Sequence, residues 1–386
     1  MFAAANTVWQ MLSNQRAMGN APDGGSDTDT ESTTSSSSSH TYQPSFCDVL
    51  VVKAMLQRAA NFPLELVDAI VDEACYWAHA HAEIDFGKET GRDLGVPSRS
   101  FHPTGGNRFL LRTPPLGFQR APVRGGGAAR KAYTTNEPEP VPAEEAAGGN
   151  CSADDIRKWL PEGQAPLLEH PCRKIVFTLV SRDQGWSNNI RDRGTYRGSY
   201  SWFDVGLERY GWGGEHKDSQ FTDTETETPP FAPAAPEAAS LYTLRPDVVT
   251  AFSPPPSNLQ HPQQQPPSDQ PPRRWQFDFP LNPGVDRLQS NKVATRDFTE
   301  HTIVWSWTDE KPPLEEVPAN EAPVPEGEDP PTRCPLDKMG RGSETGDGSF
   351  VRNLRVGDVV TVWAKARFPG WVNTVRSAKV DVYWAV

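Results

Sequence analysis

The positions of the apolar residues divide the chain into structured and unstructured stretches. In 46–77, apolar residues recur every three or four positions, as one face of a helix requires. The break at Asn61-Phe62-Pro63 separates two helices, and Pro63 suits the first turn of the second because its missing amide hydrogen is not needed there. We therefore predict a helical pair in 46–86, with its second helix at 62–77.

A different pattern, in which alternate residues are apolar, begins at Cys172. The segment RKIVFTLVS has this period of two, and TYRGSYSWFDVGL is rich in aromatic and β-branched residues, which favours strands. Further strand patterns follow in RRWQFDFP, FTEHTIVWSWT, VGDVVTVWAKARF and SAKVDVYWAV. Nine of the twelve tryptophans lie in 172–214, 273–308 and 348–386, the pieces that contain these segments, so we expect the core there.

Three pieces of the chain carry the strand patterns, and together they have the length of one common domain. We predict a mainly β fold, an antiparallel β-sandwich of jelly-roll or galactose-binding-like architecture, preceded by the helical pair and interrupted by long disordered insertions. The pieces are 151–214, which also includes a short helix, 273–308 and 348–386.

The remaining stretches are rich in Pro, Gly, Ser and acidic residues, and the chain has 38 prolines and 30 glycines. Such segments bury too little apolar surface to offset the entropy lost on ordering. We predict disorder in four ranges: a tail at 1–45, a linker at 87–150, a Pro/Gln-rich insertion at 215–272 and an acidic, Pro-rich insertion at 309–347.

The composition narrows the class of protein. No apolar run approaches the ~18 residues that a membrane span needs, and the first twenty residues lack the pattern of a signal peptide. The five cysteines are widely spaced without a CxxC pair, which argues against a disulfide framework or a zinc knuckle. We expect a soluble intracellular protein without membrane contact, in the cytoplasm or, alternatively, the nucleus.

Charge is unevenly distributed along the chain. The formal net charge is -12 at pH 7, yet 172–214, 273–308 and 348–386 together contain eighteen Lys and Arg against ten Asp and Glu. A basic sandwich suits a phosphorylated or otherwise anionic ligand, and the acidic, flexible arms would compete with that ligand for the same surface. The alternative is that dispersed charges only keep the domain in solution. Nucleic acid is not favoured, because no recognised stacking motif or basic run occurs.

Patterns for metal binding and catalysis are weak. Cys75 and His79 would share a helical face, whereas His79, His81, Glu83 and Asp85 would share an extended one. Neither set has a known metal-site spacing, and the two need incompatible backbones. We predict no metal, no cofactor and no catalytic residues, since nucleophile-elbow, GxGxxG and Walker patterns are missing too. An unrecognised hydrolase would instead use carboxylates that meet only in the fold, drawn from Asp183, Asp204, Glu208, Asp358 and Asp381.

Loops at one end of a sandwich commonly carry its binding residues. Trp and Asn side chains together suit the recognition of a sugar or a peptide. The candidates for ligand binding are therefore polar, basic and aromatic loop residues: Asp183, Gln184, Trp186, Asn188, Arg191, Arg193, Arg197, Trp371 and Asn373. The alternative is that Trp186 and Trp371 only close the end of the sandwich.

Several of these segments resemble a known family. The motifs DQGWS, YSWFDVGLER and VGDVVTVWAKARFPGWVN are similar to those of an uncharacterised family of filamentous-fungal proteins with a C-terminal β-sandwich. The β-rich part is also similar in style to galactose-binding-like and phloem-lectin-like sandwiches. The resemblance implies the fold and no activity, because the family itself has none assigned.

A second resemblance lies at 62–77, FPLELVDAIVDEACYW, which is similar to the first helix of an F-box. In that family a Leu-Pro-x-Glu-Leu segment contacts an Skp1-type adaptor, and Phe62 stands here in place of the first Leu. The resemblance implies that the partner-binding residues are Leu64, Leu66, Val67 and Ile70.

We predict a non-enzymatic intracellular binding or scaffolding protein whose basic sandwich binds a protein, glycan or anionic ligand, with a protein partner expected. The alternatives are an F-box-like substrate-recognition adaptor of a ubiquitin ligase and the unrecognised hydrolase. The adaptor requires Leu64, Leu66 and Ile70 to be exposed, and a scaffold requires them to be packed. The hydrolase requires converging carboxylates with perturbed pKa values.

Overall fold

The computed structural model describes residues 43–98, 106–123, 125–143, 149–160, 166–212, 239–251, 274–313 and 334–386. Nearly all of the predicted tail at 1–45 and most of both predicted insertions lie outside these residues. The chain divides into two compact units, one ending at Ala78 and the other starting at His79.

The first unit contains the predicted pair of helices, α2 (Phe46–Ala60) and α3 (Leu64–Glu73). A capping box starts α2: the Ser45 hydroxyl accepts from the Asp48 amide, and the Asp48 carboxylate accepts from the Ser45 amide. Pro63 directly precedes α3 in an extended conformation, which suits a residue without an amide hydrogen. The local pattern therefore places both helices correctly.

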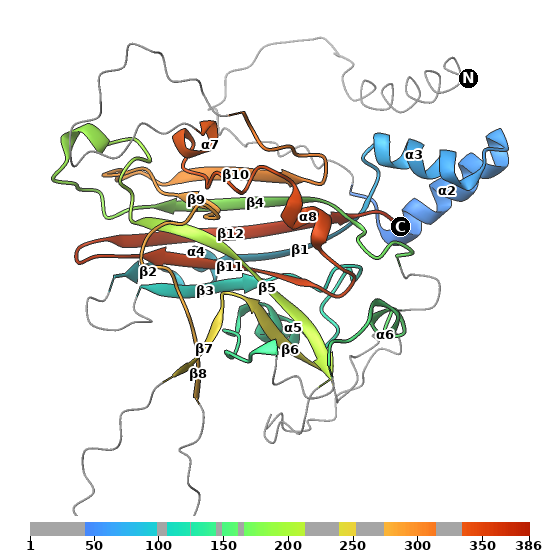
Figure 1. The fold of residues 1–386 in the computed structure, drawn as a ribbon, viewed down its shortest axis with the longest axis horizontal. Coiled ribbons are helices and arrows are strands. Elements are labelled where there is room, and N and C mark those ends of the chain that lie inside the picture. Colours follow the sequence, from blue (N-terminus) through green and yellow to red (C-terminus); the bar gives the residue numbers. More distant parts are fainter. Residues whose placement is uncertain are drawn as a thin grey trace, which may run out of the picture. The chain divides into compact units, whose positions relative to one another are not determined.

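The second unit is a β-sandwich of two antiparallel sheets (Figure 1). In sheet 1 the strand order is β1-β12-β4-β10, and β2 also pairs with β12; in sheet 2 it is β3-β11-β5-β6, and β9 also pairs with β5. Sheet 1 contains β1 (Ala78–Asp85), β2 (Leu94–Pro97), β4 (Cys172–Arg182), β10 (Thr299–Ser306) and β12 (Val372–Trp384). Sheet 2 contains β3 (Asn107–Arg112), β5 (Ser201–Trp212), β6 (Ala239–Arg245), β9 (Gln289–Ser290) and β11 (Val359–Ala366). The fold is mainly β, as predicted.

Short helices and one ribbon complete the second unit. The ribbon pairs β7 (Val248–Ala251) with β8 (Arg274–Phe277). The helices are α4 (Phe86–Thr90), α5 (Gly127–Thr135), α6 (Ala153–Arg157), the 3-10 turn η2 (Ile190–Asp192), α7 (Pro335–Lys338) and α8 (Ser349–Asn353). Within the described ranges, no helix combines the length and apolar character needed to cross a membrane.

Sheet 1 packs mainly through one of its faces. Along β4, Ile175, Phe177 and Leu179 are buried, while the alternate residues are only partly buried. The edge of Trp305 from β10 meets the ring of Phe177 at a centroid distance of 4.9 Å. This alternation is the one that the period of two in RKIVFTLVS predicts.

Sheet 2 is covered on both faces. All eight residues of β11 are buried. The face of sheet 2 turned away from sheet 1 carries Trp363, whose ring meets Phe277 and Phe279 at centroid distances of 5.4 and 5.3 Å. A strand buried on both faces needs apolar or paired residues at every position, which explains the continuous VVTVW run.

The prediction of a linker at 87–150 is wrong for its described part, which contains β2, β3 and α5. Strand β3 pairs with β11, and its Leu110 and Leu111 are buried. The backbone groups along that side of β11 need hydrogen-bond partners, and β3 supplies them. The high Gly, Pro and Arg content of this range conceals short strands.

Two further predicted boundaries need correction. The helical pair does not extend to residue 86, because α3 ends at Glu73 and β1 occupies 78–85. Its small residues Ala78, Ala80 and Ala82 alternate with His and Glu, and all three alanines are buried. The predicted insertions also contain order: 215–272 contributes β6 and β7, and 309–347 contributes α7.

Candidate functional site

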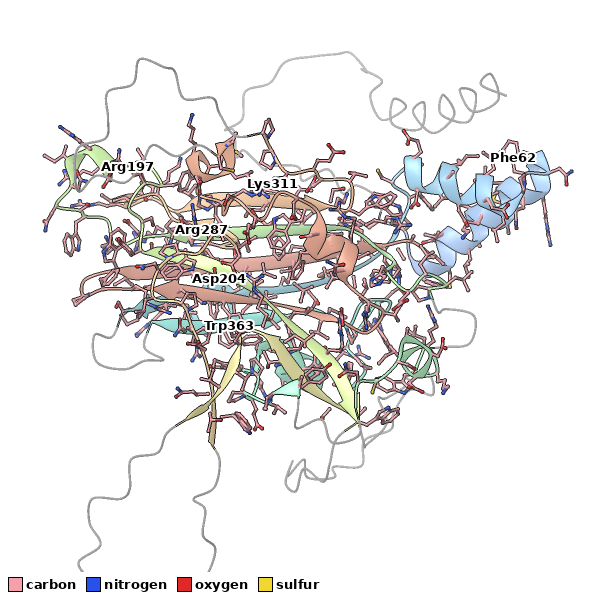
Figure 2. The ribbon with its side chains drawn as sticks, in the orientation of Figure 1. Phe62, Arg197, Asp204, Arg287, Lys311 and Trp363 are labelled. Atoms are coloured by element: carbon pink, nitrogen blue, oxygen red, sulfur yellow. The ribbon has the colours of Figure 1, made fainter. Side chains whose placement is uncertain are left out.

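The two segments that carry the predicted ligand-binding residues meet at one end of the sandwich. The β4–β5 connection spans 183–200, and the β11–β12 turn spans 367–371. Pairing of Arg182 with Thr374, and of Ser201 with Ala366, places both connections at the same end. Arg197 marks this end in Figure 2.

Large apolar side chains face solvent here. The exposed fraction is 53% for Trp186, 74% for Ile190 and 47% for Phe368. Trp186 lies directly over Gly370, where a Cβ atom would come within 3.0 Å of the indole ring. Gly370 also has φ +93°, so both the turn and this close approach require glycine.

Aromatic packing beneath these side chains supports the turn. The ring of Tyr200 meets Phe368 edge-on at a centroid distance of 4.7 Å and Trp371 at 5.5 Å. Gln184 joins the two segments, because its Oε1 accepts from the Val372 amide and its Nε2 donates to the Trp186 carbonyl. Trp371 is half-buried and therefore contributes more to packing than to the surface.

Three arginines lie in the same β4–β5 connection as Trp186 and Ile190. Arg191, Arg193 and Arg197 are all exposed, as is Asn188. The Arg193 guanidinium donates to the Ser187 carbonyl at 2.8 Å, which orients it along the loop. We call Trp186, Ile190, Phe368, Arg191, Arg193 and Arg197 the aromatic–arginine surface.

Asp183 and Asn373 belong to the same end of the sandwich but are buried. Asp183 accepts from the amides of Gly185, Ala294 and Thr295, at 2.8, 2.5 and 3.1 Å; burial is the largest influence on its pKa and raises it, against these bonds. Asn373 donates to the Trp202 carbonyl and accepts from Asn291. These contacts give both residues a structural role, which differs from the predicted contact with ligand.

Ile190 and Phe368 were not among the candidates from the sequence. Phe368 precedes the Pro369-Gly370 turn that the sequence marks, and turn residues are commonly exposed. Ile190 is the one apolar residue in the polar run SNNIRDR, and this pattern is the sequence signal for an exposed apolar side chain. Neither signal shows that the two loops converge.

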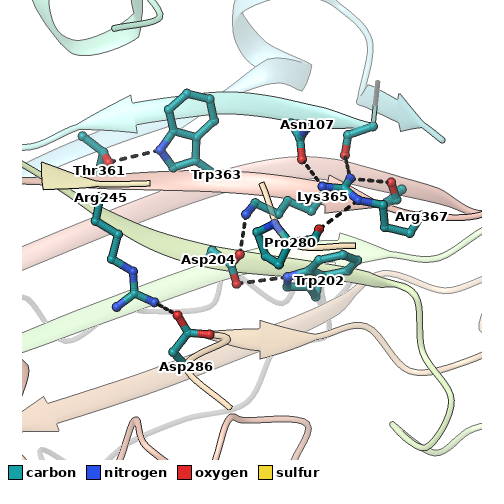
Figure 3. A network of polar contacts seen from close by, with 12 residues as sticks. Asn107, Trp202, Asp204, Arg245, Pro280, Asp286, Thr361, Trp363, Lys365 and Arg367 are labelled. Carbon is teal, nitrogen blue, oxygen red and sulfur yellow. Dashed lines mark hydrogen bonds and ion pairs between the residues drawn. The ribbon is translucent and has the colours of Figure 1, made fainter. Parts of the chain in front are cut away.

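A second polar site lies on the face of sheet 2 turned away from sheet 1 (Figure 3). The Lys365 ammonium lies 2.5 Å from an Asp204 carboxylate oxygen, and Trp202 Nε1 donates to Asp204 at 3.0 Å. Burial is the main cause that lowers the pKa of Lys365, whereas Asp204 opposes that shift. Arg367 donates to Asn107 Oδ1 at 2.6 Å and to the Pro280 carbonyl at 3.1 Å.

A cavity of about 480 Å³ adjoins this ion pair. Arg245 and Asp286 line it and bond to each other. Most charged groups at the site are thus already paired, as is usual for buried charges. We therefore interpret this network as bracing for β5 and β11, and take the aromatic–arginine surface as the candidate functional site.

The carboxylates proposed for a hydrolase each have a partner of their own. Asp183 bonds backbone amides, as above, and Asp204 pairs with Lys365. Glu208 pairs with Arg112, Asp358 with Arg209, and Asp381 with His79 and Lys379. This arrangement differs from two facing acids across a cleft, which glycoside hydrolysis requires.

No family model matches the chain, and no curated protein or solved structure matches it either. The resemblances to a fungal family and to an F-box helix rest on the quoted motifs alone.

Proposed function

We propose that this protein is a non-enzymatic binding protein and that its aromatic–arginine surface binds an acidic segment of a partner protein. The observation that carries the proposal is the exposure of Trp186, Ile190 and Phe368 beside three exposed arginines. Removal of apolar surface from water is favourable by about 25 cal/mol per Å². A partner that covers these three side chains therefore gains affinity. Trp and Arg are also the residues most enriched among binding hot spots.

The chemistry of the surface favours an acidic protein segment over a glycan. Arg191, Arg193 and Arg197 each carry a planar guanidinium, a shape that matches the two oxygens of a carboxylate. Within the chain, Arg193 already donates to the Ser187 carbonyl, and Arg197 lies 3.8 Å from Asp192 Oδ1. Ile190 offers an aliphatic tip that suits an apolar side chain better than a hydroxylated sugar. The acidic segment at 309–347 has the same chemistry as such a partner and would compete with it for the aromatic–arginine surface.

The test compares a surface variant with a matched control in full-length protein. The surface variant is Ile190→Asp with Arg191→Glu. The control is Leu167→Asp with Arg355→Glu, which also replaces one exposed apolar residue and one exposed arginine. Leu167 precedes strand β4, and Arg355 precedes strand β11. Both control residues therefore lie at the end of the sandwich opposite the candidate site.

The measurement is affinity purification from native extract, followed by quantification of co-purified proteins and a glycan array. We expect a protein with an acidic segment to be recovered by the wild type and the control and lost, by roughly tenfold or more, with the surface variant. A synthetic peptide of that segment should then compete for binding. The proposal is wrong if every recovered protein survives the surface variant, or if only glycans depend on it.

A second candidate function rests on α3. Leu64 and Leu66 are 42% and 38% exposed, as an adaptor-binding helix requires, although Ile70 is half-buried and Val67 is buried. We propose contact with an Skp1-type adaptor as the alternative role of this helix. Recovery of an Skp1-like protein and a cullin by the wild type but not by Leu64→Asp with Leu66→Asp would support it, and recovery by neither protein would contradict it.

A further inference from the structure

The fold brings the closely spaced His79 and His81 together with Asp381, which lies 302 residues after His79 in the chain. Strand β1 is extended, so His79 and His81, two positions apart, point to the same face of sheet 1. Strand β12 is the neighbour of β1, and its Asp381 meets this pair. His79 Nε2 lies 2.9 Å from Asp381 Oδ1.

The geometry of the three side chains is close to that of a metal centre. One ligand atom from each of His79, His81 and Asp381 lies within 4.8 Å of the others. The two imidazole rings are nearly parallel, with centroids 5.7 Å apart and an interplanar angle of 16°. Small changes of side-chain torsion bring such atoms to the ~2.0–2.2 Å at which Zn²⁺ binds nitrogen and oxygen.

We propose that His79, His81 and Asp381 bind one divalent transition-metal ion of the Zn²⁺ class. Two imidazoles and one carboxylate form a donor set that selects such ions over Mg²⁺ and Ca²⁺, which prefer oxygen alone. The exposed His81 gives the ion access from solvent, while the buried His79 and Asp381 hold it. Three protein ligands leave a coordination position for water.

Lys379 competes with the ion for the same carboxylate. Its ammonium lies 2.9 Å from Asp381 Oδ1, the oxygen that His79 also contacts. Its side chain is 37% exposed, so it has room to turn into solvent when a metal arrives. Removal of Lys379 should therefore strengthen metal binding, an effect opposite to that of removing a ligand.

The experiment uses untagged full-length protein titrated with Zn²⁺ by calorimetry, with Co²⁺ absorption as a second readout. The variants are His81→Ala, which removes the exposed ligand, and Lys379→Met, which removes the competitor. His170→Ala is the matched control, because His170 is a half-exposed histidine outside the cluster. Near-UV circular dichroism checks that each variant is folded.

We expect one Zn²⁺ per chain, weaker binding by roughly tenfold or more in His81→Ala, tighter binding in Lys379→Met and no change in His170→Ala. Co²⁺ should give the visible absorption of a site with nitrogen and oxygen ligands, and Mg²⁺ should not displace it. Absence of Zn²⁺ binding by the wild type would overturn the proposal. Equal affinities in the wild type and His81→Ala would do so as well.

Discussion

His301 shows how one residue's surroundings determine its chemistry. It lies on the buried face of β10, where its Nε2 atom is 3.1 Å from the Tyr196 hydroxyl. Its Nδ1 atom has no hydrogen-bond partner among the described residues. Burial, and to a lesser extent the charge of Lys292, lowers the pKa of His301 to about 4. The imidazole is therefore neutral in the folded protein at pH 6.

This pKa predicts a loss of stability in mild acid. In the unfolded chain a histidine binds a proton near pH 6.5, whereas folded His301 binds one only near pH 4. Protonation thus favours the unfolded state as the pH falls from 6.5 towards 4, by on the order of 2 kcal/mol at pH 4.5. Above pH 6.5 the effect vanishes.

Urea unfolding of wild type and His301→Gln at pH 7.5 and 4.5 measures this effect. We expect the free energy of unfolding of the wild type to fall more between the two pH values than that of the variant. Equal falls would show that other groups account for the acid sensitivity.

At the scale of elements, the β7–β8 ribbon acts as a cover for sheet 2. Strand β7 lies inside the range 215–272 predicted as a Pro/Gln-rich insertion, whereas β8 belongs to the predicted strand piece 273–308, and its Phe277 is buried against Trp363. Phe109 from β3 completes the cluster, with its ring centroid 5.3 Å from that of Trp363. A ribbon of which one strand comes from the predicted insertion thus covers the second face of β11.

Replacement of Phe277 by alanine tests this role. Truncation of a buried phenylalanine typically costs about 3 kcal/mol or more, through lost burial and the cavity that remains. We expect Phe277→Ala to lower the urea midpoint and to shift the tryptophan emission to longer wavelength, because water reaches Trp363. Val249→Ala, at a more exposed position of β7, is the control. Unchanged stability and emission in Phe277→Ala would mean that the ribbon is dispensable.

At the scale of the whole molecule, the sandwich depends on segments from both ends of the second unit. The last strand, β12, lies between β1 and β4 and also pairs with β2. Strand β3 pairs with β11, which is the last but one. The continuous chain from 151 onward therefore lacks three of the strands that complete the two sheets, β1, β2 and β3.

A shortened chain that begins at Gly149 should fail to fold cooperatively. It would leave β11 and β12 with unpaired backbone groups and would remove buried residues such as Phe109 and Leu111. We expect weak near-UV circular dichroism and a broad, non-sigmoidal urea transition, compared with a sharp transition for the full chain. A sharp transition at the midpoint of the full chain would show that 151–386 suffices.

The sequence alone determines the elements whose signal is local. The spacing of apolar residues places α2 and α3, and the period of two places β4 and β10, because an element with one buried face records that face in its own residues. The Pro369-Gly370 turn and the loop at Asp183 are likewise visible in the residues that form them. For this reason the sandwich and the region of the candidate site were predictable.

The tertiary structure alone decides which distant segments meet. Strands β1, β2 and β3 are short or rich in alanine and charge, and their order comes from pairing with β11 and β12 rather than from their own pattern. The contact of Trp186 with Gly370, and the meeting of His79 and His81 with Asp381, likewise depend on how distant segments pack and not on a local pattern. Apolar patterns record how much of each side chain is buried, but not against which partner, and both the candidate binding surface and the proposed metal site depend on the partner.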